Sequence, residues 1–322
     1  MPDHRTVFSV GNLGGEPITV LMAFDNEWAP YAATTIASTC VHAVSPVQIV
    51  VLTTNLSSKN AERFCSLISS SIHALKIIRI DPDMTKKFGS LGWWSNAAYL
   101  RLAAAEIVDT EKIIYLDSDI IVKCPLDELF SLDLRSAAVA GVVDIPSRLL
   151  QMSPRLNWLN LPKSDHYINT GVLLMDLSRL RSQGFFDAAI NWYGRNHGSV
   201  RLADQCVLNS VLINQKAYLH PRWNIRQLSL PTQDFASMLC SNLSAIFHFN
   251  VATKPWTEGA DTAVYQEWLR YFRKTTYVKE DCDRSIRNPD PSFLKHINEI
   301  EKAFREAGID PKASLRKHTS VR

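Results

Sequence analysis

The sequence lacks several features that would place the protein in a special class. Its six cysteines are scattered and form no C-x-x-C pair or zinc-finger spacing, so we expect free thiols in a reducing compartment. Basic residues barely outnumber acidic ones, and the formal net charge is only +3. Because no basic–aromatic repeat occurs either, we expect no nucleic-acid partner.

Long apolar runs are also missing. The longest early run, from Ile18 to Phe24, is far shorter than the ~18 residues that a transmembrane helix needs. The first residues lack the pattern of a signal peptide, so we expect a cytoplasmic protein. The ending KASLRKHTSVR is basic and has no acidic residue. It is interpreted either as a solvated chain end or as a segment that docks weakly on the inner, anionic face of a membrane.

Apolar runs of strand length alternate with helical patterns along most of the chain. Strands are expected at residues 18–24, 47–53, 75–80, 112–116, 137–143, 168–175 and 245–249. Helices are expected at residues 30–43, 58–71, 96–108, 178–195 and 204–213. This alternation predicts an α/β fold, with a mostly parallel central sheet that helices cover on both faces.

The alternation stops after Trp256, which predicts two parts. We expect one α/β domain over residues 1–260 and a small C-terminal helical extension over residues 261–322. The extension would hold helices at 262–275 and 292–307, followed by the basic tail.

Carboxylates follow three of the expected strands. Asp117 and Asp119 come at the end of the strand in KIIYLDSDIIV, and Asp25 and Asp144 follow two others. Aspartate is common where strands end because it suits turns, so each one alone carries little information. Ligands of such sheets bind beyond the carboxyl ends of the strands, and the coincidence therefore predicts one acidic rim.

The spacing of Asp117 and Asp119 suggests a metal site. Side chains two residues apart in an extended segment point the same way, so the two carboxylates repel each other unless a cation lies between them. A hard divalent cation is the natural occupant, with a phosphate as its further ligand. Two alternatives are a solvated turn and a phosphatase of the haloacid dehalogenase type. The phosphatase is disfavoured by Ile121 and by the absence of a Gly-Asp-x-x-x-Asp motif.

Four motifs in a fixed order give a more specific indication. They are YLDSDIIVKCPLDELFSLDL, YINTGVLLMDLSRLR, LADQCVLN and HFNVATKPW. Together they resemble glycosyltransferase family 8, the retaining sugar-nucleotide transferases that include bacterial lipopolysaccharide galactosyl- and glucosyltransferases. The resemblance runs from Ile18 to Trp256. It implies the GT-A fold, a Rossmann-like α/β domain whose metal site binds a nucleotide-diphosphate sugar.

The resemblance implies roles for residues that bind the donor. Asp117, Asp119 and His248 match the ligands of Mn²⁺, and a nitrogen ligand suits Mn²⁺ better than the alternative Mg²⁺. Ser118 belongs to the same donor-binding motif, and Lys254 matches the lysine that contacts the diphosphate.

The resemblance extends to the nucleotide and the donor sugar. Asp25 would contact uracil, and Trp28 would be the aromatic residue beside it. Arg101 would lie near the donor sugar and phosphate, the alternative being an exposed arginine on a helix. The sequence departs from the family pattern at Asn26 and Glu27, so the resemblance assigns no ribose contact to Glu27. Val251 stands where the family usually has glycine, and valine restricts the backbone of the diphosphate loop.

The last group of residues would surround the reacting carbon. Asn169 and Asp144 match residues that contact the donor sugar, and Asp204 and Gln205 match the pair near its reactive carbon. Asp204 could equally be a helix N-cap. Because the amide of Gln205 is a poor nucleophile, front-face attack is favoured, while Asp204 keeps a covalent route open.

The implied reaction is Mn²⁺-dependent transfer of a hexose from UDP-galactose or UDP-glucose to a hydroxyl group, with retention. The acceptor would be a glycan, such as a lipopolysaccharide or another lipid-linked saccharide. Trp93 and Trp94 either line the acceptor side or pack in the core. The non-enzymatic alternative is an inactive UDP-sugar sensor or scaffold.

Overall fold

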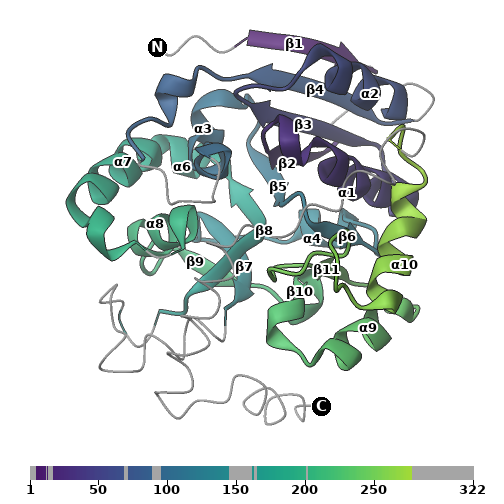
Figure 1. Cartoon of the computed structure of the whole chain (residues 1–322). Helices are drawn as coiled ribbons and strands as arrows, with labels where there is room; N and C mark the ends of the chain where they lie inside the picture. Colours follow the sequence, from purple (N-terminus) through teal and green to yellow (C-terminus); the bar gives the residue numbers. More distant parts are fainter. Residues whose placement is uncertain are drawn as a thin grey trace.

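A mixed sheet of eight strands crosses the molecule (Figure 1). The structure is a computed structural model that describes residues 5–277, except 12, 14–16, 69–71, 89–95, 145–161, 163–164 and 201. The strand order is β1-β4-β3-β2-β5-β8-β7-β9. In that order the strands are Arg5–Val10, Ala74–Arg79, Val47–Thr53, Ile18–Ala23, Lys112–Leu116, Ile168–Asp176, Val139–Val143 and Lys216–Tyr218.

The directions of the strands place several loop ends at one rim. Strands β4, β3, β2 and β5 are parallel, as the alternation of strands and helices predicts. Strand β8 runs antiparallel to both β5 and β7, so β7 points the same way as β2 and β5. The carboxyl ends of β2, β5 and β7 therefore meet the beginning of β8 at a common edge. The antiparallel pairs β1–β4, β5–β8 and β7–β8 were not predicted.

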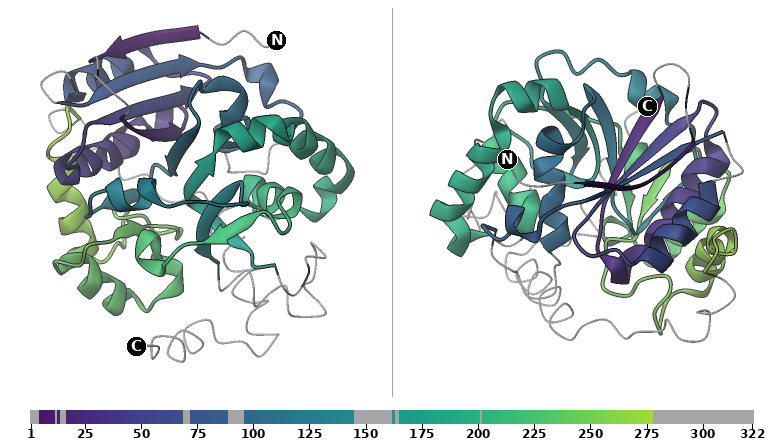
Figure 2. Two further views of the ribbon diagram at one scale, coloured as in Figure 1. Left: turned by 180° about the vertical axis from the view of Figure 1, so that it is seen from behind. Right: turned by 90° about the horizontal axis from the view of Figure 1, so that it is seen from above.

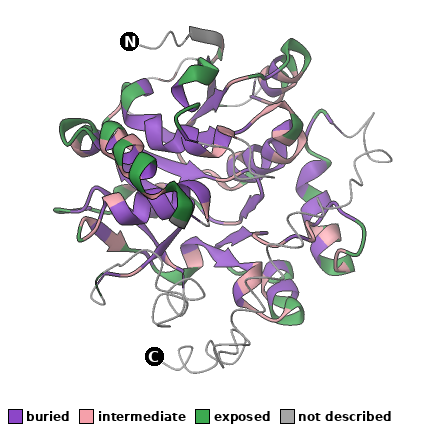
Figure 3. Cartoon of the chain, turned by 60° about the vertical axis from the view of Figure 1, so that its left-hand side comes forward, coloured by how far each residue is buried: buried purple, intermediate pink, exposed green. Residues whose placement is uncertain are grey.

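Helices cover both faces of the sheet (Figure 2). On one face, α1, α2, α4, α9 and α10 pack on one hydrophobic core. On the other face, η3, α3, α6, α7 and α8 pack on a second core. Strand β2 is buried throughout because its side chains alternate between the two: Val20 and Met22 join the first core, and Leu21 and Ala23 the second. Most of the central sheet is buried in the same way (Figure 3).

The helices agree with most of the expected ranges. The first core is covered by Ala29–His42 (α1), Ser58–Ile68 (α2), Asp127–Ser131 (α4), Thr232–Cys240 (α9) and Thr262–Phe272 (α10). The second is covered by Asn96–Ala103 (η3), Ala104–Ile107 (α3), Leu177–Ser182 (α6), Phe185–Asn196 (α7) and Ala203–Val211 (α8). The expected helix 178–195 is divided, because Gly184 adopts a φ of +60° between α6 and α7.

A second, three-stranded sheet lies beside the first. Its order is β10-β11-β6, with strands Ile225–Arg226, Ile246–His248 and Ile120–Val122. The expected strand 245–249 is thus confirmed as β11, but it belongs to this small sheet. Strand β11 is antiparallel to β6, and the register places His248 opposite Ile120. This pairing brings His248 beside the segment from Asp117 to Asp119.

Several predictions concern residues outside the described part of the chain. These are the helix at 292–307, the basic tail, Trp93, Trp94 and Cys282. The other five cysteines are free thiols, as predicted. No helix in the described residues combines the length and apolarity needed to cross a membrane. Helix α10 packs against α1 and α9, and the domain boundary near residue 260 stays a prediction.

Candidate functional site

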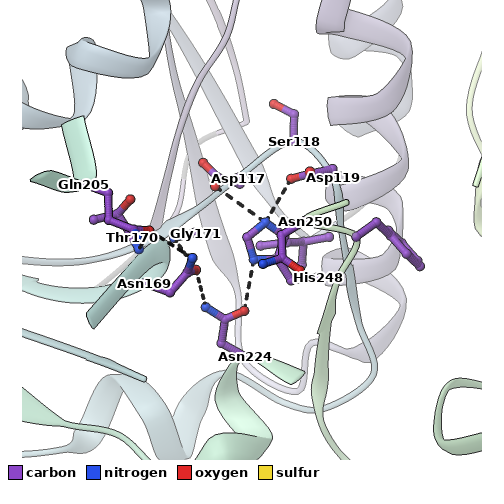
Figure 4. Close-up of polar contacts among 12 residues, drawn as sticks. Asp117, Ser118, Asp119, Asn169, Thr170, Gly171, Gln205, Asn224, His248 and Asn250 are labelled. Atoms are coloured by element: carbon purple, nitrogen blue, oxygen red, sulfur yellow. Dashed lines mark hydrogen bonds and ion pairs between the residues drawn. The ribbon is translucent and has the colours of Figure 1, made fainter. Parts of the chain in front are cut away.

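The Asp-Ser-Asp segment lies where β5 ends at the rim. The amide of Asp117 donates to the carbonyl of Gly171 at 2.9 Å, which ties the segment to β8. On the other side, the Thr35 hydroxyl of α1 donates to the carbonyl of Ser118 at 3.1 Å. The side chain of Ser118 points away from the His248 ring, on the opposite side from its two acidic neighbours (Figure 4). The alternation expected of an extended segment is therefore present.

The three predicted metal ligands come together. One ligand atom from each of Asp117, Asp119 and His248 lies within 4.8 Å of the others. Nε2 of His248 is 3.3 Å from Oδ1 of Asp119 and 3.7 Å from Oδ2 of Asp117 (Figure 4). Two carboxylates and an imidazole at this spacing fit a divalent cation that accepts oxygen and nitrogen ligands. Asp117 and Asp119 follow the end of β5, and His248 is the last residue of β11. Asp117 and His248 are therefore 131 residues apart in the sequence.

Gly171 leaves room for this arrangement, and it was not predicted as a site residue. A Cβ atom there would lie 2.2 Å from Cε1 of His248 and 2.9 Å from Oδ2 of Asp117. Any larger residue must therefore displace one of the predicted metal ligands. A glycine inside an apolar strand is the local signal that could have revealed this close approach.

Lys254 lies against the same cluster. Its Nζ is 2.6 Å from Oδ2 of Asp119 and donates to the carbonyl of Phe249 at 2.7 Å. Burial acts to raise the pKa of Asp119, but the charges of Lys254 and His248 outweigh it and hold this pKa well below its usual range. Asp119 therefore stays ionised at neutral pH.

Arg101 is buried and links two acidic residues. Its Nη2 is 2.8 Å from Oδ1 of Asp117, and its Nε is 3.0 Å from Oδ2 of Asp204. The guanidinium also lies over the ring of Tyr115, 4.3 Å from its centroid. The alternative of an exposed helix arginine is wrong, because the residue is 5% exposed and its charge is paired.

Asp204 faces the interior of the site and does not cap its helix. Helix α8 begins at Ala203 and is preceded by Leu202, so the N-cap interpretation is wrong. The Thr170 hydroxyl donates to Oδ2 of Asp204 at 3.1 Å. Burial raises the pKa of Asp204 to about 6, although Arg101 opposes the shift. Ala203 has a φ of +42°, a conformation that costs an L-residue roughly 1–2 kcal/mol, and it directly precedes the Asp-Gln pair.

Gln205, Asn169 and Asp144 form one buried group. Oε1 of Gln205 accepts from Nδ2 of Asn169 at 2.9 Å, and its Nε2 donates to Oδ2 of Asp144 at 3.1 Å. Arg226 of β10, which was not predicted, pairs with Oδ1 of Asp144 at 2.5 Å. The four residues come from separate elements, so no short sequence pattern could have joined them.

Asp25 and Trp28 lie where β2 ends. Oδ1 of Asp25 accepts from the amides of Glu27 and Trp28, at 3.0 and 3.3 Å, and so caps the short helix η1 (Asn26–Trp28). The Trp28 ring meets the ring of Trp256 edge to face at 6.2 Å. Val251 is not among the described residues with positive φ, so the loop after His248 holds a β-branched residue without that strain.

The model of the glycosyl transferase family 8 matches residues 19–260, about three quarters of the chain, and the protein belongs to this family. General stress protein A of Bacillus subtilis is 26% identical over 216 residues, which cover 63% of this chain and 74% of that protein. The lipopolysaccharide 1,2-glucosyltransferase of Escherichia coli K12 is 24% identical, with 76% of this chain and 71% of the relative covered.

A solved structure shows the same fold. The galactosyltransferase LgtC, crystallised with donor and acceptor sugar analogues, superposes with a TM-score of 0.71 at 21% identity. The match covers 82% of this chain and 98% of LgtC. The family, the GT-A fold and the enzyme class predicted from the sequence, a family-8 hexosyltransferase, are thereby confirmed.

Proposed function

We propose that the protein transfers a hexose from UDP-galactose or UDP-glucose to a hydroxyl group of a saccharide, with retention of configuration. The observation that carries the proposal is the convergence of Asp117, Asp119 and His248 at the rim of a family-8 chain. Relatives named as lipopolysaccharide glucosyl- and galactosyltransferases support a hexose donor and a glycan or lipid-linked acceptor.

The metal in this proposal is Mn²⁺. Asp117, Asp119 and His248 would hold it, and the imidazole favours Mn²⁺ over Mg²⁺. When bound, the ion supplies Lewis acidity toward the diphosphate, which is worth several kcal/mol. The ammonium of Lys254 lies next to Asp119 and would add positive charge on the leaving group's side. We assign the uracil end of the donor to Asp25 and Trp28.

Arg101 has a more indirect role in this scheme than the resemblance implies. It is already paired with Asp117 and Asp204, so it would hold these two carboxylates in place. The same pairing supports front-face attack. Asp204 is bonded to Arg101 and to Thr170, and Asp144 to Arg226 and Gln205, so both carboxylates are engaged. A phosphate oxygen of the departing UDP would then accept the acceptor's proton.

A donor screen tests the proposal. The purified protein is offered UDP-glucose, UDP-galactose, UDP-N-acetylglucosamine and a UDP-uronic acid, each with Mn²⁺ and with a chelator, with and without a saccharide acceptor. We expect UDP release from one of the two hexose donors, lost on chelation. Release from no donor contradicts the proposal. Mn²⁺-dependent UDP binding without turnover would then identify the sensor alternative.

A further inference from the structure

A line of buried amide side chains joins the histidine of the metal cluster to the Gln205 side of the site (Figure 4). Nδ1 of His248 lies 3.0 Å from Oδ1 of Asn224, and Nδ2 of Asn224 donates to Oδ1 of Asn169 at 2.8 Å. Asn169 in turn donates to Gln205. The four residues are 2–8% exposed, so water does not replace these bonds.

A main-chain amide fixes the orientation of this line. The amide of Gly171 donates to one end of the Asn169 side chain at 3.0 Å, so that end must be the oxygen. Asn224 must therefore turn its nitrogen toward Asn169 and its oxygen toward His248. A second main-chain amide, that of Thr170, donates to Oε1 of Gln205 at 3.1 Å and fixes the other end in the same way.

The orientation of Asn224 determines the tautomer of His248. An amide oxygen only accepts hydrogen bonds, so Nδ1 of His248 must carry the hydrogen. The lone pair of the neutral ring is then on Nε2. This is the nitrogen that lies 3.3 Å from Asp119 and 3.7 Å from Asp117. A ring nitrogen must present its lone pair to bind a metal.

We propose that Asn224 is a positioning residue for His248: it holds the ring in the Nδ1–H tautomer and aims Nε2 at the cation. The inference rests on the proposed metal site, but the tautomer itself does not. Asn224 lies between the short helix η5 (Pro221–Trp223) and β10 and belongs to none of the four sequence motifs. Partners of this kind typically change metal affinity by about 10–100-fold when they are removed.

Two substitutions separate the functions of Asn224. Asn224→Leu removes both bonds at nearly the same volume, whereas Asn224→Asp keeps an acceptor for Nδ1 and loses the donor to Asn169. The tautomer of His248 is read from two-bond ¹⁵N–¹H spectra of the metal-free protein at alkaline pH, where the ring is neutral, with the signal assigned by His248→Gln. The affinity for Mn²⁺, with and without UDP, is measured by electron paramagnetic resonance.

We expect the wild type and Asn224→Asp to show the Nδ1–H tautomer, and Asn224→Leu to lose it and to bind Mn²⁺ about 10–100-fold more weakly. Asn209→Leu is the matched control. This asparagine is also buried, but within the described part of the chain its side-chain amide bonds main-chain atoms of Ile168 and Gln205 alone. The Asn209→Leu change should lower Tm without changing the tautomer of His248.

An unchanged tautomer in a folded Asn224→Leu protein overturns the inference. A wild type that shows the Nδ1–H form but binds no Mn²⁺ contradicts only the proposed metal.

Discussion

Two polar clusters of this molecule differ in how their charges are balanced and in how far they are open to solvent. The rim cluster (Asp117, Asp119, His248 and Lys254) presents ligand atoms that converge within a few ångströms. The Lys216 cluster pairs Lys216 with Asp165 at 2.6 Å, and the carbonyl of Asn209 and the hydroxyl of Tyr218 complete it. By residue type alone, both look like sites of buried charge.

The difference is the balance of charge and the access to solvent. The Lys216 and Asp165 side chains are 0% and 1% exposed, and one cation meets one anion. At the rim, while the His248 ring is neutral, the three carboxylates of Asp117, Asp119 and Asp204 meet two permanent cations among the described residues, Arg101 and Lys254, and the Asp117 side chain is 23% exposed. A surplus negative charge at an open edge attracts a cation, whereas a closed pair has only a structural role.

The largest expected effect comes from removing charge at the rim. Asp119→Asn should lower metal-dependent turnover by at least about 10³-fold, because the lost metal stabilisation is worth several kcal/mol and each ~1.4 kcal/mol is tenfold. Donor turnover and Mn²⁺ affinity measure this, and circular dichroism confirms folding. Asp234→Asn, at an exposed residue of α9, is the control. Normal turnover in folded Asp119→Asn would refute the proposed site.

Breaking the Lys216 cluster should lower the stability of the fold and leave the rim cluster unchanged. Lys216→Met leaves the Asp165 charge buried without its cation, which typically costs about 3–5 kcal/mol. Urea unfolding measures the loss, and Asp165→Asn added to Lys216→Met should recover part of it. Mn²⁺ affinity of the folded variant should be unchanged. A loss below ~1 kcal/mol would mean that the pair does not stabilise the fold.

Adding a methyl group at Gly171 should disturb the rim cluster by steric contact alone. Gly171→Ala places a methyl group against His248 and Asp117 without altering any charge. We expect Mn²⁺ binding to weaken by about 10–100-fold as the ligands shift, the range typical of disturbed ligand orientation. Gly194→Ala in α7 is the control, since its Cβ meets nothing within 4 Å and alanine favours a helix by about 0.5–1 kcal/mol. Equal Mn²⁺ affinities would show that the ligands accommodate the methyl group.

The smallest expected effect is a dependence of the protein's stability on pH through the buried histidine His73. Burial lowers the pKa of His73, whose Nδ1 accepts from the amide of Val47 at 3.1 Å. The folded protein keeps this ring neutral, so its stability is complete above pH 6.5 and falls as the unfolded chain takes up a proton below that value. The loss is at most ~1.4 kcal/mol per pH unit. Urea midpoints at pH 7.5 and 5.5 measure it, and His73→Gln should reduce the difference. His42, whose pKa is also lowered, adds to the loss, whereas Asp204, whose pKa burial raises to about 6, opposes it.

The sequence predicts the regular elements of the core well. The strands at 47–53 and 112–116 match β3 and β5 because continuous runs of Val, Ile and Leu leave few other structures. Prediction fails for the short strands β6 and β10, whose two or three residues carry no period of their own. It also missed α9 and the division between α6 and α7.

For the site, the sequence by itself determined the chemistry that is local. The Asp117–Asp119 spacing predicts a paired site because an extended chain aims alternate side chains the same way, and the resemblance to family 8 adds His248. The tertiary structure alone decided that β11 pairs with β6, that Arg101 is buried between two carboxylates, and that Asn224 turns its oxygen to His248. These contacts join residues far apart in the chain. Their geometry depends on strand register and packing, which no short segment encodes.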